Sequence, residues 1–443
     1  MVSVLRTELR RTVAPWLVFL LLAVGLGYFF LFSGPWWKDA QAWDLQWTPS
    51  VLWSRYALSL LWPIIVAAAA IQGMRDRRSG MDELLSTTPR PVAHRTAQAG
   101  LAIGVAAVAG FLVLVVVGLV QVIVHDGPFG FAWVLPLLAG IVSVLAGVAV
   151  GLAVGRLLPH PLTAPAAGVA ALVVTVVLQM AGVGGSAVQE RLPNWLALLS
   201  PAAAQPRSAY VVPAVSVSVG QLCWFLGLAA TGFLVLAVRR WFAMLPAVVG
   251  VAVAVALFPA SAEGNTTPDA EAAALVCDGP VCVTRLHAGW LSTVAGPGAA
   301  ALAKLAKLPS APSRIVETTE SLYATHPGAA DPATLQVRRD SSALTGLSGA
   351  DLEFELLAAG PSCSGLAGEL AARYVVASWL LGDLRPLPHA NTLGDVTPRL
   401  VRDAWTKLRA LPADEQLARV AAARQAQQSC TGDPYAALTG ASR

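Results

Sequence analysis

One polar stretch decides how the first half of the chain folds: Arg75-Asp-Arg-Arg-Ser-Gly-Met-Asp-Glu-Leu-Leu-Ser-Thr-Thr-Pro-Arg-Pro-Val-Ala-His-Arg95. Long apolar runs flank it on both sides, and it holds five arginines. Membrane proteins keep clusters of Arg and Lys in their cytoplasmic loops. We therefore expect this stretch on the cytoplasmic side of a membrane, and its position sets the direction in which the neighbouring spans cross.

The middle of this stretch predicts a short helix. Ser79 is suited to cap its start, and the carboxylates of Asp82 and Glu83 follow where they interact favourably with the helix dipole. Pro89 and Pro91 end it. Its one apolar face is made by Met81, Leu84 and Leu85. A helix this short is not stable alone in water, so we expect it to dock on another surface.

The order of features in this stretch resembles the first cytoplasmic loop of type-2 ATP-binding-cassette exporter permeases. A basic cluster follows the second span, and Ser-Gly-Met-Asp-Glu-Leu-Leu and Thr-Pro-Arg-Pro come after it. In that family the loop carries a coupling helix that sits on the ATPase subunit. The resemblance reaches to about Arg240 and implies a separate ATPase partner and a homo- or heterodimer of permease subunits. The residues that it places on the ATPase are Ser79, Met81, Asp82, Glu83, Leu84 and Leu85.

A second interpretation of the stretch stays open. The arginines alone are typical of a solvated loop that only orients the protein in the membrane. Such a loop accounts for the charge. It does not account for a capped helix with an apolar face between two stop signals, and this difference favours the coupling helix.

The composition of the whole chain is that of a membrane protein. Of its 443 residues 56% are hydrophobic and 13% are charged, and the mean hydropathy is +0.63. Soluble domains carry about 25% charged residues. The net charge of +4 does not indicate nucleic-acid binding, because the arginines cluster beside apolar runs. The high Ala, Val, Leu, Gly and Arg content with few lysines is typical of a bacterium with a GC-rich genome.

Several apolar runs approach the length of a bilayer-spanning helix, about 20 residues. They are Val13–Phe32, Tyr56–Met74, Leu101–Val124, Phe131–Val154, Ala164–Val183, Val217–Val238 and the shorter Trp241–Phe258. The first is a retained anchor rather than a signal peptide, because its apolar part is too long and no Ala-x-Ala site follows. Gly184–Ser216, semi-apolar and interrupted by prolines, predicts an interfacial or partly re-entrant helical piece.

The basic residues give these spans one consistent topology. Inner segments hold eleven arginines: Arg6, Arg10, Arg11, Arg75, Arg77, Arg78, Arg90, Arg95, Arg156, Arg239 and Arg240. Outer segments between spans hold only Lys38, Arg55, Arg191 and Arg207. We therefore expect the N-terminus in the cytoplasm and everything after Phe258 outside the cell. Arg55 is expected to snorkel into the headgroups, and tryptophans such as Trp47 to anchor helices at the same level.

Four of the five cysteines fall in the part expected outside the cell: Cys277, Cys282, Cys363 and Cys430. An even number in an oxidising compartment favours two disulfides. Cys277 and Cys282 flank an Asp-Gly-Pro turn and are the clearest pair, and Cys363 with Cys430 would then close a long loop. Three connectivities stay open. A zinc site is disfavoured, because the cysteine spacing is wrong and no histidine is near.

The part after the last span shows mixed secondary structure. Branched and alternating residues predict strands at Val281–Leu286, Ile315–Thr319, Thr334–Arg338 and Leu352–Leu357. Helices are predicted at Ala299–Leu308, Gly365–Leu381, Thr397–Ala410 and Ala413–Gln428. The third of these has Thr397 as its cap and Pro398 at its first position.

The predicted fold is an all-α polytopic membrane domain, residues 1–262, with six core helices and a seventh, followed by a small α+β extracytoplasmic domain, residues 263–443. We expect no enzyme activity and no cofactor or metal. The segment around Glu369 has no histidine for zinc, and no Gly-x-Ser-x-Gly or ATP-binding Gly-x-x-x-x-Gly-Lys-Ser/Thr occurs. The sequence predicts an exporter permease subunit in the cell membrane. The alternative is a membrane-anchored extracytoplasmic sensor, binding or assembly domain without transport activity.

Overall fold

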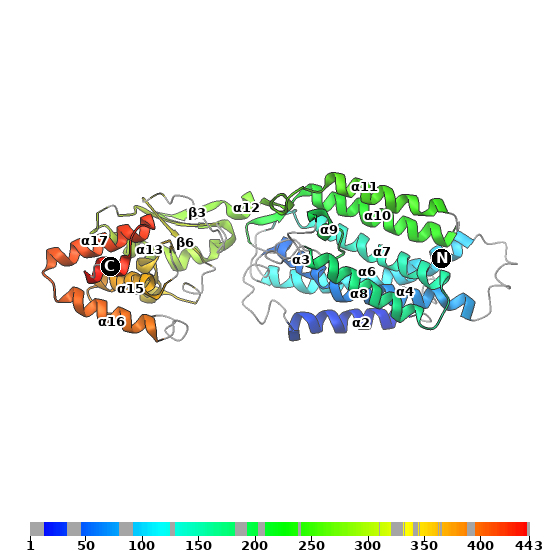
Figure 1. Ribbon diagram of the computed structural model, residues 1–443, viewed down its shortest axis with the longest axis horizontal. Helices are drawn as coiled ribbons and strands as arrows, with labels where there is room; N and C mark the ends of the chain where they lie inside the picture. Colours follow the sequence, from blue (N-terminus) through cyan, green and yellow to red (C-terminus); the bar gives the residue numbers. More distant parts are fainter. Residues whose placement is uncertain are drawn as a thin grey trace. The chain divides into compact units, whose positions relative to one another are not determined.

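The computed structural model describes residues 13–32, 46–78, 92–124, 129–181, 193–202, 209–237, 241–309, 311–319, 331, 333–339, 344, 346–361, 363, 366–387 and 395–440. The chain divides into two compact units (Figure 1). We call them the helical unit, which ends at Asp269, and the C-terminal unit, which begins at Ala270. The boundary expected from the sequence lay between residues 262 and 263.

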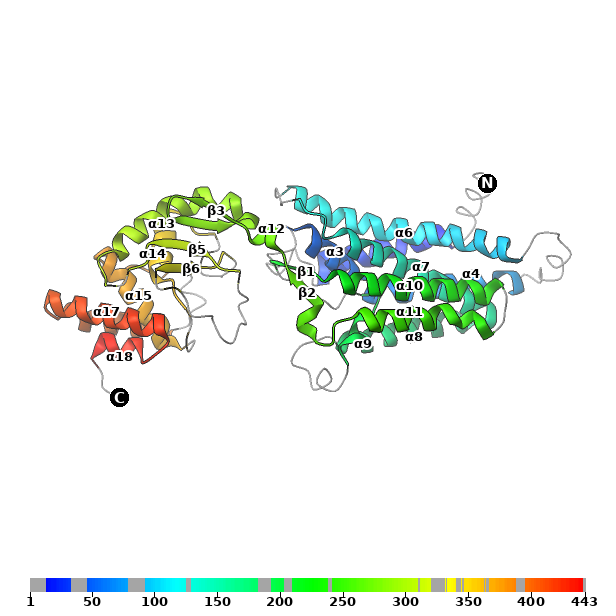
Figure 2. The same ribbon diagram turned by 90° about the horizontal axis from the view of Figure 1, so that it is seen from above.

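The helical unit is a bundle of long apolar helices (Figure 2). Those long and apolar enough to cross a membrane are α2 (Ala14–Gly27, continued by the π-helical η1, Tyr28–Phe32), α4 (Leu58–Arg78), α6 (Val92–Val124), α7 (Val134–Leu157), α8 (Thr163–Met180) and α10 (Val215–Ala237). A shorter apolar pair follows, η2 (Trp241–Met244) and α11 (Leu245–Leu257). Six of these seven helices coincide with the predicted runs to within about four residues, whereas α6 begins at Val92, nine residues before the predicted Leu101. The structure is mostly helical, and six of its helices are long and apolar enough to cross a membrane, which is compatible with the predicted fold class.

One helix of this unit was not predicted. Helix α3 (Trp47–Tyr56) precedes α4, from which only Ala57 separates it, and most of its residues are buried. The arginine pattern predicts an outer segment at residues 33–50 whose tryptophans lie at the membrane interface, and α3 begins within it. Pro49 is compatible with a helix here, since it lies in the first turn, where no backbone N–H bond is lost.

Glycines at four-residue intervals line the face of α7 that packs on α4: Gly147, Gly151 and Gly155. A Cβ on Gly147 would lie 2.7 Å from the indole nitrogen of Trp62, and one on Gly151 would lie 2.7 Å from the Cβ of Ala69. At Gly155 it would overlap the carbonyl oxygen of Ala70. Small residues at this spacing let membrane helices approach backbone to backbone. We call this contact the glycine seam.

The seam fixes the direction of the helices. Along α4, residue numbers rise from Trp62 to Ala70 as their partners on α7 rise from Gly147 to Gly155, so the two helices are parallel. Helices α2 and α6 are parallel too, because Leu21 contacts Gly110 and Gly25 contacts Leu114. Helices α6 and α7 are antiparallel, because Gly100 meets Leu152 whereas Phe111 meets Gly140. These directions alternate as successive membrane crossings would.

Helices α10 and α11 form an antiparallel pair that ends the helical unit. Gly227 lies against the carbonyl group of Pro246, and Gly250 lies against that of Cys223. After the short η3 (Ala262–Asn265), strand β2 (Thr266–Pro268) pairs with β1 (Val211–Pro213), just before α10. The chain thus leaves the unit at the end where α10 begins.

The predicted helical piece between α8 and α10 is present as the short α9 (Asn194–Leu198). The side-chain amide of Asn194 donates to the carbonyl oxygen of Pro259, and the amide of Gln221 donates to that of Leu198. These bonds tie α9 to the ends of α10 and α11.

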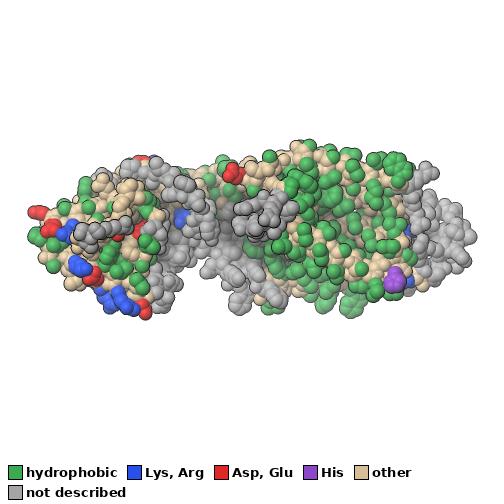
Figure 3. Space-filling view, viewed as in Figure 1, with side chains coloured by type: hydrophobic (Ala, Val, Ile, Leu, Met, Phe, Trp, Pro, Cys, Tyr) green, Lys and Arg blue, Asp and Glu red, His purple; other side chains and the backbone are tan. Residues whose placement is uncertain are grey.

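The surface of the helical unit is apolar, as a bilayer requires. Large side chains such as Trp16, Val169 and Trp241 are exposed on it. Figure 3 shows hydrophobic side chains covering the drawn face of the long helices, whereas charged side chains gather on the C-terminal unit. An exposed apolar area of this extent is unusual for a soluble monomer, and it supports the membrane assignment.

The C-terminal unit contains a four-stranded sheet in the order β3-β4-β5-β6. Its strands are β3 (Leu275–Asp278), β4 (Val281–Thr284), β5 (Arg314–Glu317) and β6 (Thr334–Val337). Strands β3 and β4 form a hairpin, and β4, β5 and β6 are parallel. Helix α13 (Leu291–Leu305) connects β4 to β5 and packs on both, since Gly298 lies against Val281 and Ile315.

The remaining helices complete one apolar core with the sheet. They are α12 (Ala270–Ala273), η4 (Arg285–Trp290), α14 (Gly349–Ala358), α15 (Ala367–Leu381), α16 (Val396–Arg409), α17 (Ala413–Ser429) and α18 (Pro434–Thr439). Helix α15 lies in the middle of this core and buries Ala371, Val375 and Leu380 among others. The strands predicted at 281–286, 315–319 and 334–338 and the helices predicted at 365–381 and 413–428 are present within a few residues.

Three predictions in this unit need correction. The helix predicted at Ala299–Leu308 begins eight residues earlier, at Leu291, and ends at Leu305. Residues Leu352–Leu357 belong to helix α14 and not to a strand. Their Leu-Glu-Phe-Glu-Leu alternation has the period of a strand, but the helix is buried on several sides and even Glu355 lies inside. Thr397 does not cap α16. The helix begins one residue earlier, at Val396, and Thr397 is buried in its first turn.

We expect Gly151→Ala to destabilise the helical unit, because the new methyl group has no space unless two backbones separate. Overpacking of this kind costs about 1–3 kcal/mol. Gly27→Ala on α2 is the matched control, since a Cβ there meets no atom within 4 Å. The measurement is the thermal unfolding midpoint of each purified variant in detergent. Equal midpoints for the two variants would show that the seam tolerates a wider helix spacing.

The two disulfides should differ in their effect on the C-terminal unit. Cys363–Cys430 closes a loop of 67 residues and Cys277–Cys282 a loop of 5 residues. Loop-closure entropy gives about 4 kcal/mol for the long loop and about 2 kcal/mol for the short one. We therefore expect the Cys363→Ser/Cys430→Ser variant to unfold at a lower temperature than Cys277→Ser/Cys282→Ser. The reverse order would contradict an entropic origin.

Candidate functional site

The predicted coupling residues, Ser79, Met81, Asp82, Glu83, Leu84 and Leu85, lie outside the described residues. The structure does describe the two helices that they join. Helix α4 ends at Arg78 and α6 begins at Val92. Because α4 is parallel to α7, this junction lies at the same end of the unit as Arg156, in the last turn of α7. The connecting segment is thus anchored at a basic end of the bundle.

The predicted cysteine pairs are both present. Cys277 is bonded to Cys282 across the β3–β4 hairpin, where the two residues are direct cross-strand partners. Cys363 is bonded to Cys430, which follows α17. The long bridge ties the last helices of the unit to the segment before α15. Cys223 on α10 is a free thiol.

Arg55, in the last turn of α3, is buried in the helical unit with only 1% of its surface exposed. Its Cγ lies 3.2 Å from the position that a Cβ on Gly140 would take, beside the ring of Phe111. Gly140 is six residues into α7, about 9 Å from the start of that helix. The expectation that Arg55 snorkels to the headgroups is therefore wrong. Gly140 leaves room for its side chain inside the bundle.

The guanidinium of Arg55 is not paired within the described structure. Its Nε and Nη2 atoms are buried and have no hydrogen-bond partner there. Among the described side chains of residues 13–262, none is a carboxylate. A buried charge costs several kcal/mol unless it is paired and hydrogen-bonded. An unpaired ionisable group in a membrane helix bundle marks a functional site by default.

The start of α3 and Trp133, the residue before α7, add further unpartnered polar atoms. The side-chain nitrogens of Gln46, Trp47 and Trp133 and the hydroxyl of Ser50 are buried without a hydrogen-bond partner in the described part. The rings of Trp47 and Trp133 are stacked with their centroids 5.7 Å apart. The helix start has no side-chain cap. We call Gln46, Trp47, Ser50, Arg55 and Trp133 the α3 donor cluster.

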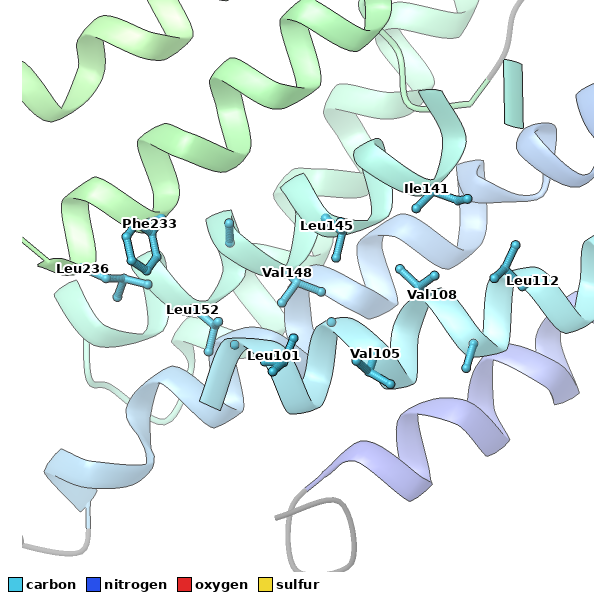
Figure 4. Close-up of a pocket in the computed structure, with 14 residues that line it drawn as sticks. Leu101, Val105, Val108, Leu112, Ile141, Leu145, Val148, Leu152, Phe233 and Leu236 are labelled. Carbon is cyan, nitrogen blue, oxygen red and sulfur yellow. The ribbon is translucent and has the colours of Figure 1, made fainter. Parts of the chain in front are cut away.

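A second feature of the helical unit is an apolar groove of about 650 Å³ between α6, α7 and α10 (Figure 4). At one end Leu101, Leu152, Phe233 and Leu236 point into it, and at the other end Leu112 and Ile141 do so. Phe233 and Leu236, in the last turns of α10, lie at the same end of the groove as Leu101 near the start of α6. Helix α10 therefore ends on the side of the bundle where the 79–91 segment joins α4 to α6. The groove offers apolar contact only, without a polar group to orient a ligand.

Two of the buried carboxylates in the described part of the C-terminal unit, Glu317 and Glu355, are held in different ways. Glu317 accepts hydrogen bonds from the backbone and hydroxyl of Thr284, at 2.8 Å each, and lies 2.5 Å from Nδ1 of His287. Burial alone raises its pKa, but the hydrogen bonds and charge of His287 and the bonds from Thr284 outweigh it, so the pKa is lowered. Glu355 accepts one bond from the hydroxyl of Tyr374, and burial raises its pKa to about 7.

Nothing in the described part of the C-terminal unit forms a metal centre, since no group of three His, Cys, Asp or Glu side chains there is placed to hold an ion. Glu369, whose surrounding segment lacks a histidine for zinc, accepts a hydrogen bond from the backbone N–H of Cys363. It also forms an ion pair with Arg373. Its role is to hold the chain beside the long disulfide. The absence of enzyme activity stays a prediction.

Sequence reasoning missed the α3 donor cluster and the glycine seam. The seam had a visible signal, because Gly147, Gly151 and Gly155 recur every fourth residue, the spacing of close helix packing. The burial of Arg55 had none. Whether an arginine at the edge of an apolar run faces lipid or protein depends on Gly140, which is far away in sequence.

The buried carboxylates predict opposite effects of pH. The folded-state pKa of Glu355, about 7, exceeds its ordinary value of 4.5, so its favourable contribution is present below about pH 4.5 and is lost as the pH rises through 7. The loss is on the order of 3 kcal/mol. Because glutamine does not ionise, we expect Glu355→Gln to remove this loss of stability. The thermal unfolding midpoint of the purified variant should then exceed that of the wild type at pH 8 but not at pH 5.

Glu317→Gln is the matched control. The pKa of Glu317 is lowered, so its contribution is present above about pH 4.5 and is lost as the pH falls through the lowered value. This variant should unfold at a lower temperature than the wild type at pH 8. If both variants shift the midpoint alike at both pH values, the carboxylates do not titrate as proposed.

Comparison with known proteins does not identify the chain. No protein-family model matches it, and neither a curated protein nor a solved structure does. We therefore infer its function from the residues and their geometry.

Proposed function

We propose that this chain is the membrane-spanning permease subunit of an ATP-binding-cassette exporter. It is a multi-pass protein of the cell membrane, pairs with a second permease subunit, identical or related, and is driven by a separate ATPase. The ATPase docks on the segment Ser79–Ser86. The observation that carries the proposal is this segment, a capped apolar helix candidate joining two antiparallel membrane helices at their basic end.

The helix directions support a cytoplasmic position for the docking segment. Helices α4, α7 and α10 end at the same end of the bundle, and the residues that follow or complete them are basic: Arg75, Arg77, Arg78, Arg156, Arg239 and Arg240. Positive charge is retained on the cytoplasmic side of membranes. An ATPase in the cytoplasm reaches the segment there.

The same directions support an extracytoplasmic C-terminal unit. Helix α11 returns the chain to the end where α10 begins, and β1–β2 lies at that end. It is opposite to the 79–91 junction. Two disulfides in the unit that follows fit an oxidising compartment.

The rival proposal is a membrane-anchored extracytoplasmic binding or assembly domain. The observation that favours it is the C-terminal unit itself, which has one apolar core built from a sheet and helices. A domain of this size folds and binds a partner without transport. The two proposals differ in whether the 79–86 segment has a partner.

We expect the double change Leu84→Asp/Leu85→Asp to abolish association with the ATPase. Each leucine contributes about 1.5–3 kcal/mol when it is removed from water, and a buried unpaired carboxylate costs several more. The measurement is co-purification with the ATPase subunit encoded beside this chain, together with the amount of chain inserted in the membrane. Normal insertion with lost association supports the exporter.

Thr87→Asp/Thr88→Asp is the matched control, because it adds the same two charges outside the apolar face. It should leave association unchanged. If the leucine variant still binds the ATPase, or if the wild type binds none, the docking segment is only an orienting loop and the anchored domain becomes the better proposal.

A further inference from the structure

The α3 donor cluster poses a problem of charge that the proposed transport function does not solve. Arg55 is fully buried, whereas Arg78 is exposed and Arg156 half-exposed at their helix ends. A guanidinium has five N–H donors and no acceptor, and its charge persists at any physiological pH. With two of its nitrogens unbonded, Arg55 lacks the acceptors that a stable buried arginine needs.

The other unpartnered polar atoms of the cluster are mostly hydrogen-bond donors. They are the amide nitrogen of Gln46, two indole nitrogens and one hydroxyl. Gln46 and Ser50 are themselves more than nine-tenths buried. The three nitrogens only donate, as the uncapped backbone N–H groups at the start of α3 do, and the hydroxyl can donate as well as accept. Donors along the helix that carries a buried cation complement an anion, and a cationic or purely apolar ligand leaves the nitrogens unsatisfied.

The arrangement along the helices gives the ligand a shape. Helix α3 runs parallel to the start of α7, with Trp47 against Trp133 at one end and Arg55 against Gly140 at the other. Trp47 and Arg55 are eight residues apart, which is about 12 Å along a helix. Stacked indole rings present apolar faces. A ligand that contacts both places has an anionic group and an apolar part.

We propose that the α3 donor cluster binds an amphipathic anion, and that Arg55 holds its carboxylate or phosphate group. Such an anion has two sources, an acidic lipid of the bilayer or a separate amphiphile. Binding requires neither nucleotide nor ATPase, so its failure and the failure of the exporter proposal are distinguishable.

One alternative must be separated from this proposal. The segments 33–45 and 125–128, outside the described residues, contain the acidic residues Asp39, Asp44 and Asp126. An ion pair from one of them would neutralise Arg55 without a ligand. The two explanations predict opposite stabilities for a variant that lacks the arginine, because removing one partner of a buried pair is destabilising whereas removing an unpaired buried charge is not.

The experiment uses the full chain in nanodiscs of phosphatidylcholine. Dodecyl phosphate is the anionic probe, dodecyl maltoside the uncharged amphiphile, and inorganic phosphate the anion without an apolar part. We expect dodecyl phosphate to raise the thermal unfolding midpoint and the other two to leave it unchanged. Arg55→Met should lower the affinity for dodecyl phosphate at least about thirtyfold, which is the loss expected when one partner of a buried charge pair is removed.

Two further variants keep the test decisive. Arg78→Met removes an exposed arginine and should bind the probe like the wild type. Arg55→Lys keeps the charge but not the bidentate fork, so it should bind more weakly than the wild type even if Arg55→Met does not fold. Without probe, Arg55→Met should unfold at the same temperature as the wild type or a higher one.

Three results would overturn the proposal. The first is that Arg55→Met and Arg55→Lys bind the probe at wild-type strength, and the second is that inorganic phosphate or dodecyl maltoside stabilises the chain as much as dodecyl phosphate does. The third is that Arg55→Met destabilises the chain and that the triple variant Asp39→Asn/Asp44→Asn/Asp126→Asn does so equally. If the wild type binds the probe, phosphatidylglycerol nanodiscs identify the source. Competition by this lipid supports a lipid ligand, and undiminished probe binding supports a separate amphiphile at the same site.

Discussion

The close approach of α4 to α7 is the contact on which the helical unit depends. A bilayer provides no hydrophobic force that drives helices together, so they associate through packing and hydrogen bonds. Gly147, Gly151 and Gly155 supply that packing because they let the two backbones touch. The indole of Trp62 adds a hydrogen bond of 2.9 Å to the carbonyl oxygen of Ser143 on the same face. The register that follows places α3 beside the first turns of α7 and brings Arg55 onto Gly140.

Much of the fold was predictable because its signals are local. A helix that crosses a bilayer needs a certain length of apolar sequence, so the long helices could be bounded within a few residues, except for the start of α6. The hairpin cysteines also share a local turn. The errors arose where packing decides the outcome. Leu352–Leu357 alternates like a strand, yet a helix buried on several sides accepts the same residues. Arg55 looks like a lipid-facing anchor until the distant Gly140 makes room for it. The coupling residues remain a prediction from sequence alone.

The buried carboxylates of the C-terminal unit differ from Arg55 in how their charge is compensated. In the described part of that unit each buried carboxylate has a hydrogen-bond partner. Glu317 is ionised among the donors of His287 and Thr284, and Glu355 is bonded to Tyr374 with a pKa raised to about 7. Both arrangements avoid an uncompensated charge, one by pairing and one by protonation. Arginine has no neutral form within reach of physiological pH, so Arg55 can only be paired. The described structure supplies no partner for its Nε and Nη2 atoms. Arg424 in the C-terminal unit is also buried with its Nε unbonded, so the reason to assign a ligand to Arg55 is its place within a bundle of membrane helices.

The glycine seam also bears on how the two proposed sites act together. Arg55 and the docking segment lie at opposite ends of α3–α4, since Arg78 is twenty-three residues after Arg55, about 35 Å along a helix. Packed backbones do not deform gradually, so α3–α4 and α7 are expected to move as one body. A displacement at Ser79–Ser86 then reaches the start of α3 without a relay of side chains. Because Gly140 and Trp133 belong to the same body as Arg55 and Trp47, such a motion keeps the α3 donor cluster intact.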